Sequence, residues 1–290
     1  MQLDIFNDSR DVMLRNDVLS ALQQYDAADA RRALRALANE YPDDVAQVYF
    51  GSMVNALEGR STAPFCRHEA ALQACQALSH EVQPAVARAF PGQSGATWLA
   101  PLWVELAGRA AALPFRAEHA DAHAAPLFLL AARWAEASDA ISRIASWRRI
   151  PAPLCWMTEA RYRLDGLDAA WPFLVELAWL SPSRFDQLLS RLDDACVNRL
   201  RRAFDMSFEG AGDLGDLAWF PAWVLTDKTG LAPLFKRAEP SRQNAPERAA
   251  KVMLGLLSLE RQGRHHELLE TRRELQALNG ALYAAYMKTR

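Results

Sequence analysis

The stretch "YDAADARRALRALANEYPDD" (residues 25–44) decides how the chain is expected to fold. Ala30, Leu34 and Leu37 are followed by Pro42, at spacings of four, three and five residues. In an α-helix with this spacing, the first three side chains lie on one face. A small residue lets a second helix approach, the two larger residues fill the next turns, and the proline prevents the helix from continuing. The stretch therefore predicts a helix that packs along one face and ends before Pro42.

The same spacing returns elsewhere in the chain. The stretch "DGLDAAWPFLVELAWLSPS" (residues 165–183) repeats it with a second set of residues. Two other stretches repeat it with one change each, an early proline in the first and a glycine in place of proline in the second. Self-similarity of this kind is typical of stacked helical hairpins. The three sets are Ala170, Leu174, Leu177 and Pro182; Ala140, Ile144, Trp147 and Pro151; and Leu268, Arg272, Leu275 and Gly280.

These units resemble the second helix of the tetratricopeptide-repeat (TPR) family, which carries a small residue, a large one, a small one and then proline at this spacing. Leu37, Trp147, Leu177 and Leu275 are bulkier than the family's usual residue, and the Trp, Leu-Gly and aromatic signature of its first helix is not clear in any unit. The resemblance implies an α-solenoid, a right-handed superhelix of antiparallel helical hairpins, with a concave groove that binds peptides or partner proteins.

The remaining sequence also favours an all-α chain. Apolar residues recur every three or four positions, sustained strand-like alternation is almost absent, and 15 prolines and 13 glycines separate the segments. We expect helices that include 67–81, 83–90, 117–136, 138–148 and 169–180, with Asp168 capping the last. We expect one helical-repeat domain over residues 1–290, with an N-terminal segment at 1–7 and a possible subdivision near 91–95 or 205–216.

The composition limits the class of function. A net charge of −2 with no basic cluster argues against direct nucleic-acid binding. The longest apolar stretch contains Glu105 and Arg109, which favours a buried helix over a membrane span. Four scattered cysteines and no signal peptide predict reduced thiols in a cytoplasm, and the abundance of Ala and Arg suggests a bacterial gene.

His119 and His123 give the most metal-like spacing. On the predicted helix 117–136 they would share a face as i and i+4 neighbours. No Glu follows the first His, so the zinc-protease motif lacks its general base. A metal-dependent hydrolase around this pair is therefore the weakest alternative, and a solvated helix face is favoured. Cys66, Cys75, His68 and His80 lack a C-x-x-C knuckle, so buried cysteines and a surface histidine are expected instead of a zinc site.

Two further features suggest partner binding. The acidic, glycine-rich stretch 205–216 precedes Trp219, Phe220 and Trp223 and could form a binding loop with them, but an exposed turn followed by core aromatics is favoured. Four groups of arginines could line a groove and bind carboxylates, or could form the wet faces of helices. These groups are Arg31, Arg32 and Arg35; Arg148 and Arg149; Arg199, Arg201 and Arg202; and Arg272 and Arg273.

The N-terminal residues Gln2, Leu3, Asp4, Ile5 and Phe6 resemble the short motif with which bacterial replication and repair proteins bind the sliding clamp, usually Gln-Leu-Ser/Asp-Leu-Phe. By that resemblance Gln2 bonds at the rim of the clamp's groove, and Leu3, Ile5 and Phe6 enter apolar subsites. The alternative, which we favour, is that these side chains cover the open end of the first hairpin.

The sequence thus predicts a non-enzymatic module without a cofactor that binds a protein or peptide in a bacterial cytoplasm. A sliding-clamp-associated replication or repair accessory factor is the second interpretation.

Overall fold

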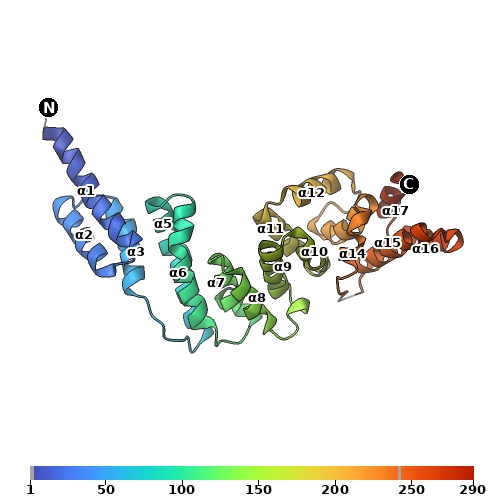
Figure 1. Cartoon of the computed structure of the whole chain (residues 1–290), viewed down its shortest axis with the longest axis horizontal. Helices are drawn as coiled ribbons and strands as arrows, with labels where there is room; N and C mark the ends of the chain where they lie inside the picture. Colours follow the sequence, from blue (N-terminus) through green and yellow to red (C-terminus); the bar gives the residue numbers. More distant parts are fainter. Residues whose placement is uncertain (1–2, 241–242) are drawn as a thin grey trace. The chain divides into compact units, whose positions relative to one another are not determined.

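The computed structural model describes residues 3–240 and 243–290, with side chains from Arg10 onward (Figure 1). Helices are the regular elements throughout this described part, which contains no strand, so the predicted all-α class is confirmed. None of the helices in these ranges is long and apolar enough to cross a membrane.

The chain divides into two compact units, residues 1–140 and 141–290. This boundary lies in neither of the segments predicted from sequence, 91–95 and 205–216. A single repeat domain over residues 1–290 stays a prediction.

In the first unit the helices are α1 (Leu3–Gln23), α2 (Ala27–Glu40), α3 (Ala46–Glu58), α4 (His68–Ala77), a π-helical turn η1 (Leu78–Val82), α5 (Gln83–Ala89), α6 (Gln93–Ala110), the 3-10 helix η2 (Ala117–Ala122) and α7 (Ala124–Leu130). Helix α8 (Trp134–Ser142) contains the boundary.

In the second unit the helices are η3 (Trp147–Arg149), α9 (Pro151–Asp165), α10 (Leu167–Leu180), α11 (Pro182–Leu192), α12 (Ala195–Ser207), η4 (Leu214–Trp219), α13 (Phe220–Asp227), η5 (Thr229–Leu231), α14 (Ala232–Phe235), α15 (Ala245–Gln262), α16 (His265–Leu278) and α17 (Gly280–Lys288).

The spacing pattern correctly identifies the buried faces of α2 and α10. Ala30, Leu34 and Leu37 are all buried on α2, and the matching residues of α10 are buried as well. Helix α2 packs between α1 and α3, and α10 packs between α9 and α11. Since a helix of this length is marginally stable alone, this packing supplies most of its stability.

The first unit is also closed by a contact between segments far apart in sequence. The Trp98 indole at the start of α6 donates from Nε1 to the Leu22 carbonyl at 2.7 Å, and the Tyr25 hydroxyl donates to the Trp98 carbonyl at 2.9 Å. The two rings stack with centroids 5.6 Å apart. The end of α1 is therefore joined directly to α6, in addition to the packing of successive helices.

Residues 68–89 form one helical run, where the sequence predicted two helices, 67–81 and 83–90. The π-helical turn η1 joins α4 to α5, with the Gln83 N–H bonded to the Leu78 carbonyl five residues earlier. Pro84 follows in the first turn of α5. Because proline has no N–H to donate, a wider turn before it keeps the helix continuous.

Helix α13 lies at the centre of the second unit. It contacts α10, α12, α15 and α17, and Phe220, Val224 and Leu225 are almost completely buried. The last helix is held by Tyr286, whose buried ring places its hydroxyl 2.5 Å from the Glu260 carboxylate, to which it donates. This unit therefore combines contacts between successive helices with contacts around one central helix.

A buried ion pair ties three segments of the second unit together. Arg148 donates from Nε and Nη2 to both carboxylate oxygens of Glu176, at 2.8 and 2.7 Å. The Glu239 N–H donates to the same carboxylate at 2.8 Å, and the Glu239 side chain pairs with Arg148. Burial raises the pKa of Glu176, although the hydrogen bond from Arg148 opposes this shift.

Other predicted helix boundaries were also wrong, as three examples show. Asp168 does not cap α10, because Gly166 is the N-cap and Pro172 lies inside the helix. The predicted helix 138–148 ends at Ser142, and Ser146 is left-handed. The predicted helix 117–136 is divided into η2, α7 and the start of α8.

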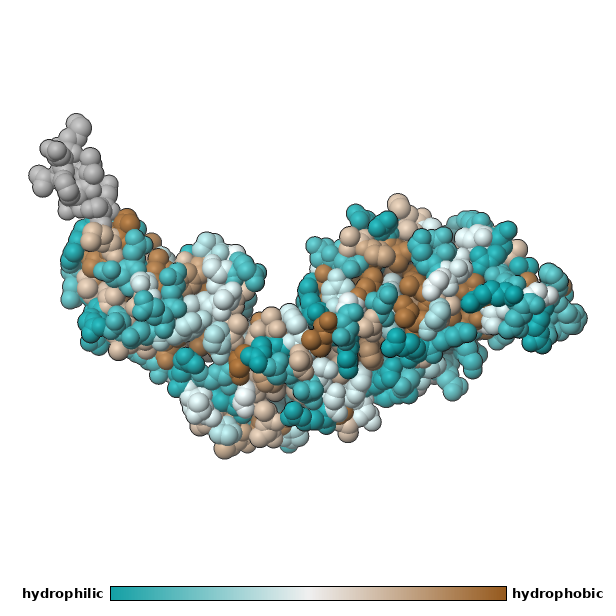
Figure 2. All heavy atoms as spheres, in the orientation of Figure 1, coloured by the Kyte–Doolittle hydropathy of each residue, from teal (hydrophilic) through white to brown (hydrophobic). Residues whose placement is uncertain are grey.

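Large apolar side chains also reach the surface, on separate elements. Examples are Met13 on α1, Val48 on α3, Leu164 on α9 and Met206 on α12. Figure 2 shows hydrophobic residues among hydrophilic ones on the face in view. Exposed apolar residues scattered in this way are ordinary and do not by themselves mark a binding face.

Replacing Trp98 by Phe tests the contact between α1 and α6. The ring stacking can persist, but the Leu22 carbonyl loses the indole donor and keeps only the Tyr25 N–H, so we expect unfolding of the first unit to require about 1–2 kcal/mol less free energy. Urea unfolding followed by far-UV circular dichroism measures this loss. Tyr25→Phe, which removes the other hydrogen bond, is expected to cost less because that bond is partly exposed. Wild-type stability in Trp98→Phe would contradict the role of the contact.

Replacing Arg148 by Met tests the buried ion pair. The Glu176 carboxylate would remain buried without its guanidinium, at a cost of about 3–5 kcal/mol near neutral pH. The pKa of Glu176 is raised in the folded protein. Its contribution to the free energy of unfolding is therefore most favourable when the pH is below the ordinary pKa of 4.5, and it declines as the pH rises through the folded pKa. The loss should therefore shrink in acid.

The double variant Arg148→Met, Glu176→Gln is the control, because it has no carboxylate to protonate. It should be more stable than the single variant at neutral pH. Thermal unfolding over a pH series gives both results, and an equal loss for Arg148→Met at every pH would contradict the assignment.

Candidate functional site

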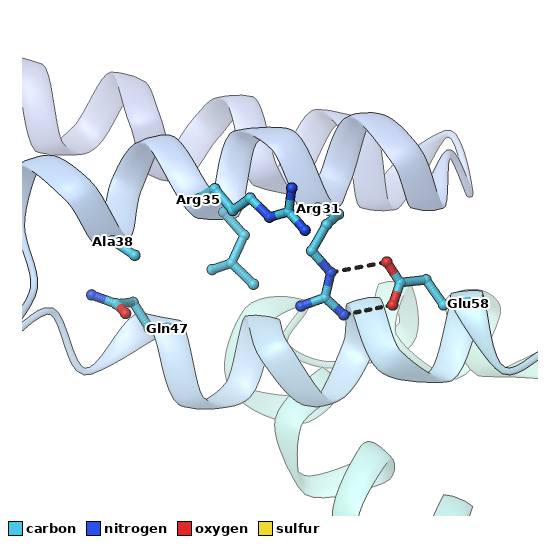
Figure 3. Close-up of a pocket in the computed structure, with 6 residues that line it drawn as sticks. Arg31, Arg35, Ala38, Gln47 and Glu58 are labelled. Atoms are coloured by element: carbon cyan, nitrogen blue, oxygen red, sulfur yellow. Dashed lines mark hydrogen bonds and ion pairs between the residues drawn. The ribbon is translucent and has the colours of Figure 1, made fainter.

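An open groove lies between α2 and α3 in the first unit, with a volume of about 480 Å³. Helix α2 contributes Arg31, Leu34, Arg35 and Ala38, and α3 contributes Gln47 and Glu58 (Figure 3). Leu34 is one of the three buried residues of the spacing pattern on α2. The groove therefore lies next to the helix face that packs into the core.

One side of the groove is fixed by a bidentate ion pair. Arg31 donates from Nε and Nη2 to the two carboxylate oxygens of Glu58, at 2.9 and 2.6 Å, as Figure 3 shows. Arg31 Nη2 also donates to the Asn55 side-chain oxygen at 2.5 Å. The hydrogen bond from Arg31 lowers the pKa of Glu58, and the charges of Arg31 and Arg35 act in the same direction.

Arg35 is the uncompensated charge of the groove. Its side chain is exposed and makes no hydrogen bond or ion pair with any residue that the structure describes. Since Arg31 and Glu58 compensate each other, the lining carries one net positive charge. A guanidinium binds a carboxylate through two parallel hydrogen bonds, which suits an acidic group on a partner.

Most of the other arginines singled out in the sequence serve internal contacts. Arg148 holds Glu176, and Arg149 donates to the Pro240 carbonyl at 2.7 Å. Among the rest, Arg32 pairs with Asp29, Arg201 pairs with Asp186 and Asp205, Arg202 donates to the Asn198 carbonyl, and Arg272 donates to the Tyr286 hydroxyl. Within the described part of the chain, Arg199 and Arg273 are exposed without such a contact, as Arg35 is.

The three aromatic residues predicted to bind a partner have different environments. Phe220 is 1% exposed and belongs to the core, and Trp219 packs partly against that core. Trp223 is half-buried against Phe204, with centroids 5.4 Å apart, and it lines a hollow of about 320 Å³ between α12, α13 and α17. Their role in binding stays a prediction.

The acidic residues before these aromatics bond to their own loop. Asp216 accepts from the Ala211 and Gly212 N–H groups, at 3.0 and 2.7 Å, and Asp213 accepts from the Gly215 N–H at 2.7 Å. These contacts satisfy backbone donors in the turn, as Asp side chains commonly do.

The helix face expected for His119 and His123 is wrong. His119 has non-helical backbone angles within η2, and His123 is extended and caps α7, with its Nδ1 accepting from the Ala125 N–H at 3.1 Å. His119 instead stacks on His68 at 5.5 Å, and the His68 Nε2 lies 2.8 Å from the Pro114 carbonyl. The residues with described side chains include no cluster of three His, Cys, Asp or Glu placed to hold a metal.

The cysteines beside these histidines differ in environment. Cys75 is buried as predicted, which raises the pKa of its thiol to about 11, whereas Cys66 is exposed, so its predicted burial is wrong. A thiol with so high a pKa is protonated at neutral pH and is a poor nucleophile.

The clamp-like motif lies outside the residues whose side chains are described. Gln2 is outside the described residues altogether, and Leu3, Asp4, Ile5 and Phe6 fall in the first turn of α1 without described side chains. Their role stays a prediction.

The sequence analysis did not predict that α2 and α3 form a groove together. Glu58 and Gln47 come from α3, and no local pattern links Glu58 to Arg31, which lies 27 residues earlier. The i, i+4 placement of Arg31 and Arg35 on one face of α2 was the available signal.

Comparison with protein-family models, with curated proteins and with solved structures finds no match to this chain. The fold and the groove define the class: an all-α protein with an open groove between consecutive helices, whose Arg35 has no partner among the residues that the structure describes.

Replacing His123 by Asn tests the electrostatics of the histidine region. Burial lowers the pKa of His123 to about 4 from its ordinary 6.5, so the stability that neutral His123 contributes is present above pH 6.5 and is lost as pH falls toward 4. We expect the wild type to lose up to about 1.4 kcal/mol per pH unit in this window from this group.

Asn can accept the same cap hydrogen bond but does not titrate. The variant should therefore lose less stability than the wild type in urea unfolding between about pH 7 and about pH 4.5. Identical pH dependence in the two proteins would contradict the assignment.

Proposed function

We propose that this chain is a non-enzymatic, TPR-like interaction module of a bacterial cytoplasm, which binds an acidic segment of a protein or peptide in the groove between α2 and α3. The observation that carries the proposal is the exposed guanidinium of Arg35, unpaired among the described residues and set in a groove of about 480 Å³.

The contacts around Arg35 support recognition of an acidic side chain or a C-terminal carboxylate. Glu58 lines the same groove, but Arg31 neutralises it through two hydrogen bonds, so it does not compete with a ligand for Arg35. Leu34 and Ala38 add apolar surface beside the charge. A bidentate contact of this kind fixes the orientation of the bound group as well as adding affinity.

The packing of successive helices supports the repeat part of the proposal. Helices α1, α2 and α3 pack in succession, as do α9, α10 and α11. Hairpins that cover one another in this way leave one face of each helix pair open, and in solenoids such faces form the binding surface.

A display library of random peptides tests the function on the full chain. We expect the selected peptides to be rich in Asp and Glu. A selected peptide should bind Arg35→Glu at least about tenfold more weakly than the wild type, because reversing the charge replaces attraction by repulsion. Calorimetry measures the two dissociation constants.

Arg273→Glu is the matched control, since Arg273 is also exposed, forms no ion pair with a described residue and lies on α16 in the second unit. It should bind like the wild type. Selected peptides without an excess of acidic residues, or equal affinity for the two variants, would rule out the proposal.

A further inference from the structure

A second hollow, unrelated to the arginine groove, lies within the second unit. It has a volume of about 500 Å³ and is walled by α10, by the segment from Phe235 to Pro240 and by α15. Val175, Trp179, Phe235 and Leu254 give it a largely apolar lining. The volume and the apolar character are those of pockets that take small molecules.

Trp179, one of the residues that line the hollow, carries an unsatisfied donor. Trp179 is 7% exposed, and its Nε1–H is buried without a hydrogen-bond partner. Buried polar groups are nearly always paired, and leaving one unpaired costs about 1–3 kcal/mol. A ligand chain packed against this ring would change the surroundings of its N–H group.

Two lysines add positive charge to the lining. The sequence contains four lysines, and two of them, Lys236 and Lys251, line this hollow. Both are exposed, and neither forms an ion pair with a residue in the described ranges. By contrast, Lys228 pairs with Asp227 at 2.7 Å. Apolar walls beside two unpaired ammonium groups are complementary to an amphipathic anion.

Glu247 is the acidic residue of the lining, and its carboxylate accepts a hydrogen bond from the nearby backbone. It is 2% exposed and accepts from the Gln243 N–H at 2.5 Å. Its charge would repel a ligand anion placed next to it, so the lysines, which are exposed, define where the anionic group binds. The apolar part of the ligand then lies against Trp179 and Leu254.

From this arrangement we infer that the hollow binds a small monocarboxylic acid with an apolar chain, such as a medium-chain fatty acid. The carboxylate lies at Lys236 and Lys251, and the chain fills the space between α10 and α15. The site is independent of the arginine groove, because all of its residues belong to the second unit.

Calorimetry with decanoate on the full chain is the test. We expect binding, with decanol at least about tenfold weaker because it lacks the charge. The double variant Lys236→Ala, Lys251→Ala should lose at least about tenfold in affinity. Lys228→Ala, Lys288→Ala removes the same charge elsewhere and should bind like the wild type.

Gly255→Leu blocks the site without harming the fold. Gly255 lines the hollow on α15, and a Cβ added there meets no atom within 4 Å. Leucine also favours a helix over glycine, so the variant should melt no lower than the wild type and should not bind decanoate. In the wild type, decanoate should shift the indole N–H resonance of Trp179, identified by its absence in Trp179→Phe.

Three results would overturn the inference: no binding of decanoate, equal binding by Gly255→Leu, or an unmoved Trp179 resonance. A short peptide with an apolar C-terminus that bound here while decanoate did not would also overturn it, and would assign the hollow to a protein partner.

Discussion

The structure depends on one constraint: its helices are short, and each has an apolar face that it cannot cover by itself. A helix of three or four turns gains little from its own hydrogen bonds, so it is stable only when another helix covers that face. The chain meets this constraint with two separate cores, one built from residues 14–131 and the other from residues 154–286. Directional contacts then fix the packing, as the Trp98 indole does in the first unit and the Arg148–Glu176 pair does in the second.

Many arginines are used for internal contacts, whereas others are exposed without a partner among the described residues. Arginines on several helices reach across to carboxylates of neighbouring elements, as Arg31 does to Glu58 and Arg191 to Glu159. Exposed pairs of this type contribute little to stability, but they occupy charge that would otherwise attract a partner. Arg35 lines one hollow, and Lys236 and Lys251 line another, without a partner among the described residues; both proposals rest on that position.

The sequence predicted which helix faces are buried better than it predicted where the helices begin and end. The spacing of Ala30, Leu34 and Leu37 correctly predicted a buried helix face, because burial depends on periodicity alone. The course of the chain around Pro172 and His119 was predicted wrongly, since a proline inside a helix and a 3-10 segment both depend on tertiary packing. Of the candidate site, the arginines of α2 could be named in advance. Their sorting into paired and unpaired could not, because Glu58 and Glu176 lie about 28 residues from their partners.

Hydrogen exchange on the full chain tests most directly whether helices are stabilised by burial within their own unit. Leu37 is fully buried between α1, α2 and α3, and Leu37→Ala would leave a cavity in the first core costing about 2–5 kcal/mol. The account predicts faster exchange across α1, α2 and α3, with unchanged exchange in α10, α13 and α15. Equal acceleration in both units would contradict it.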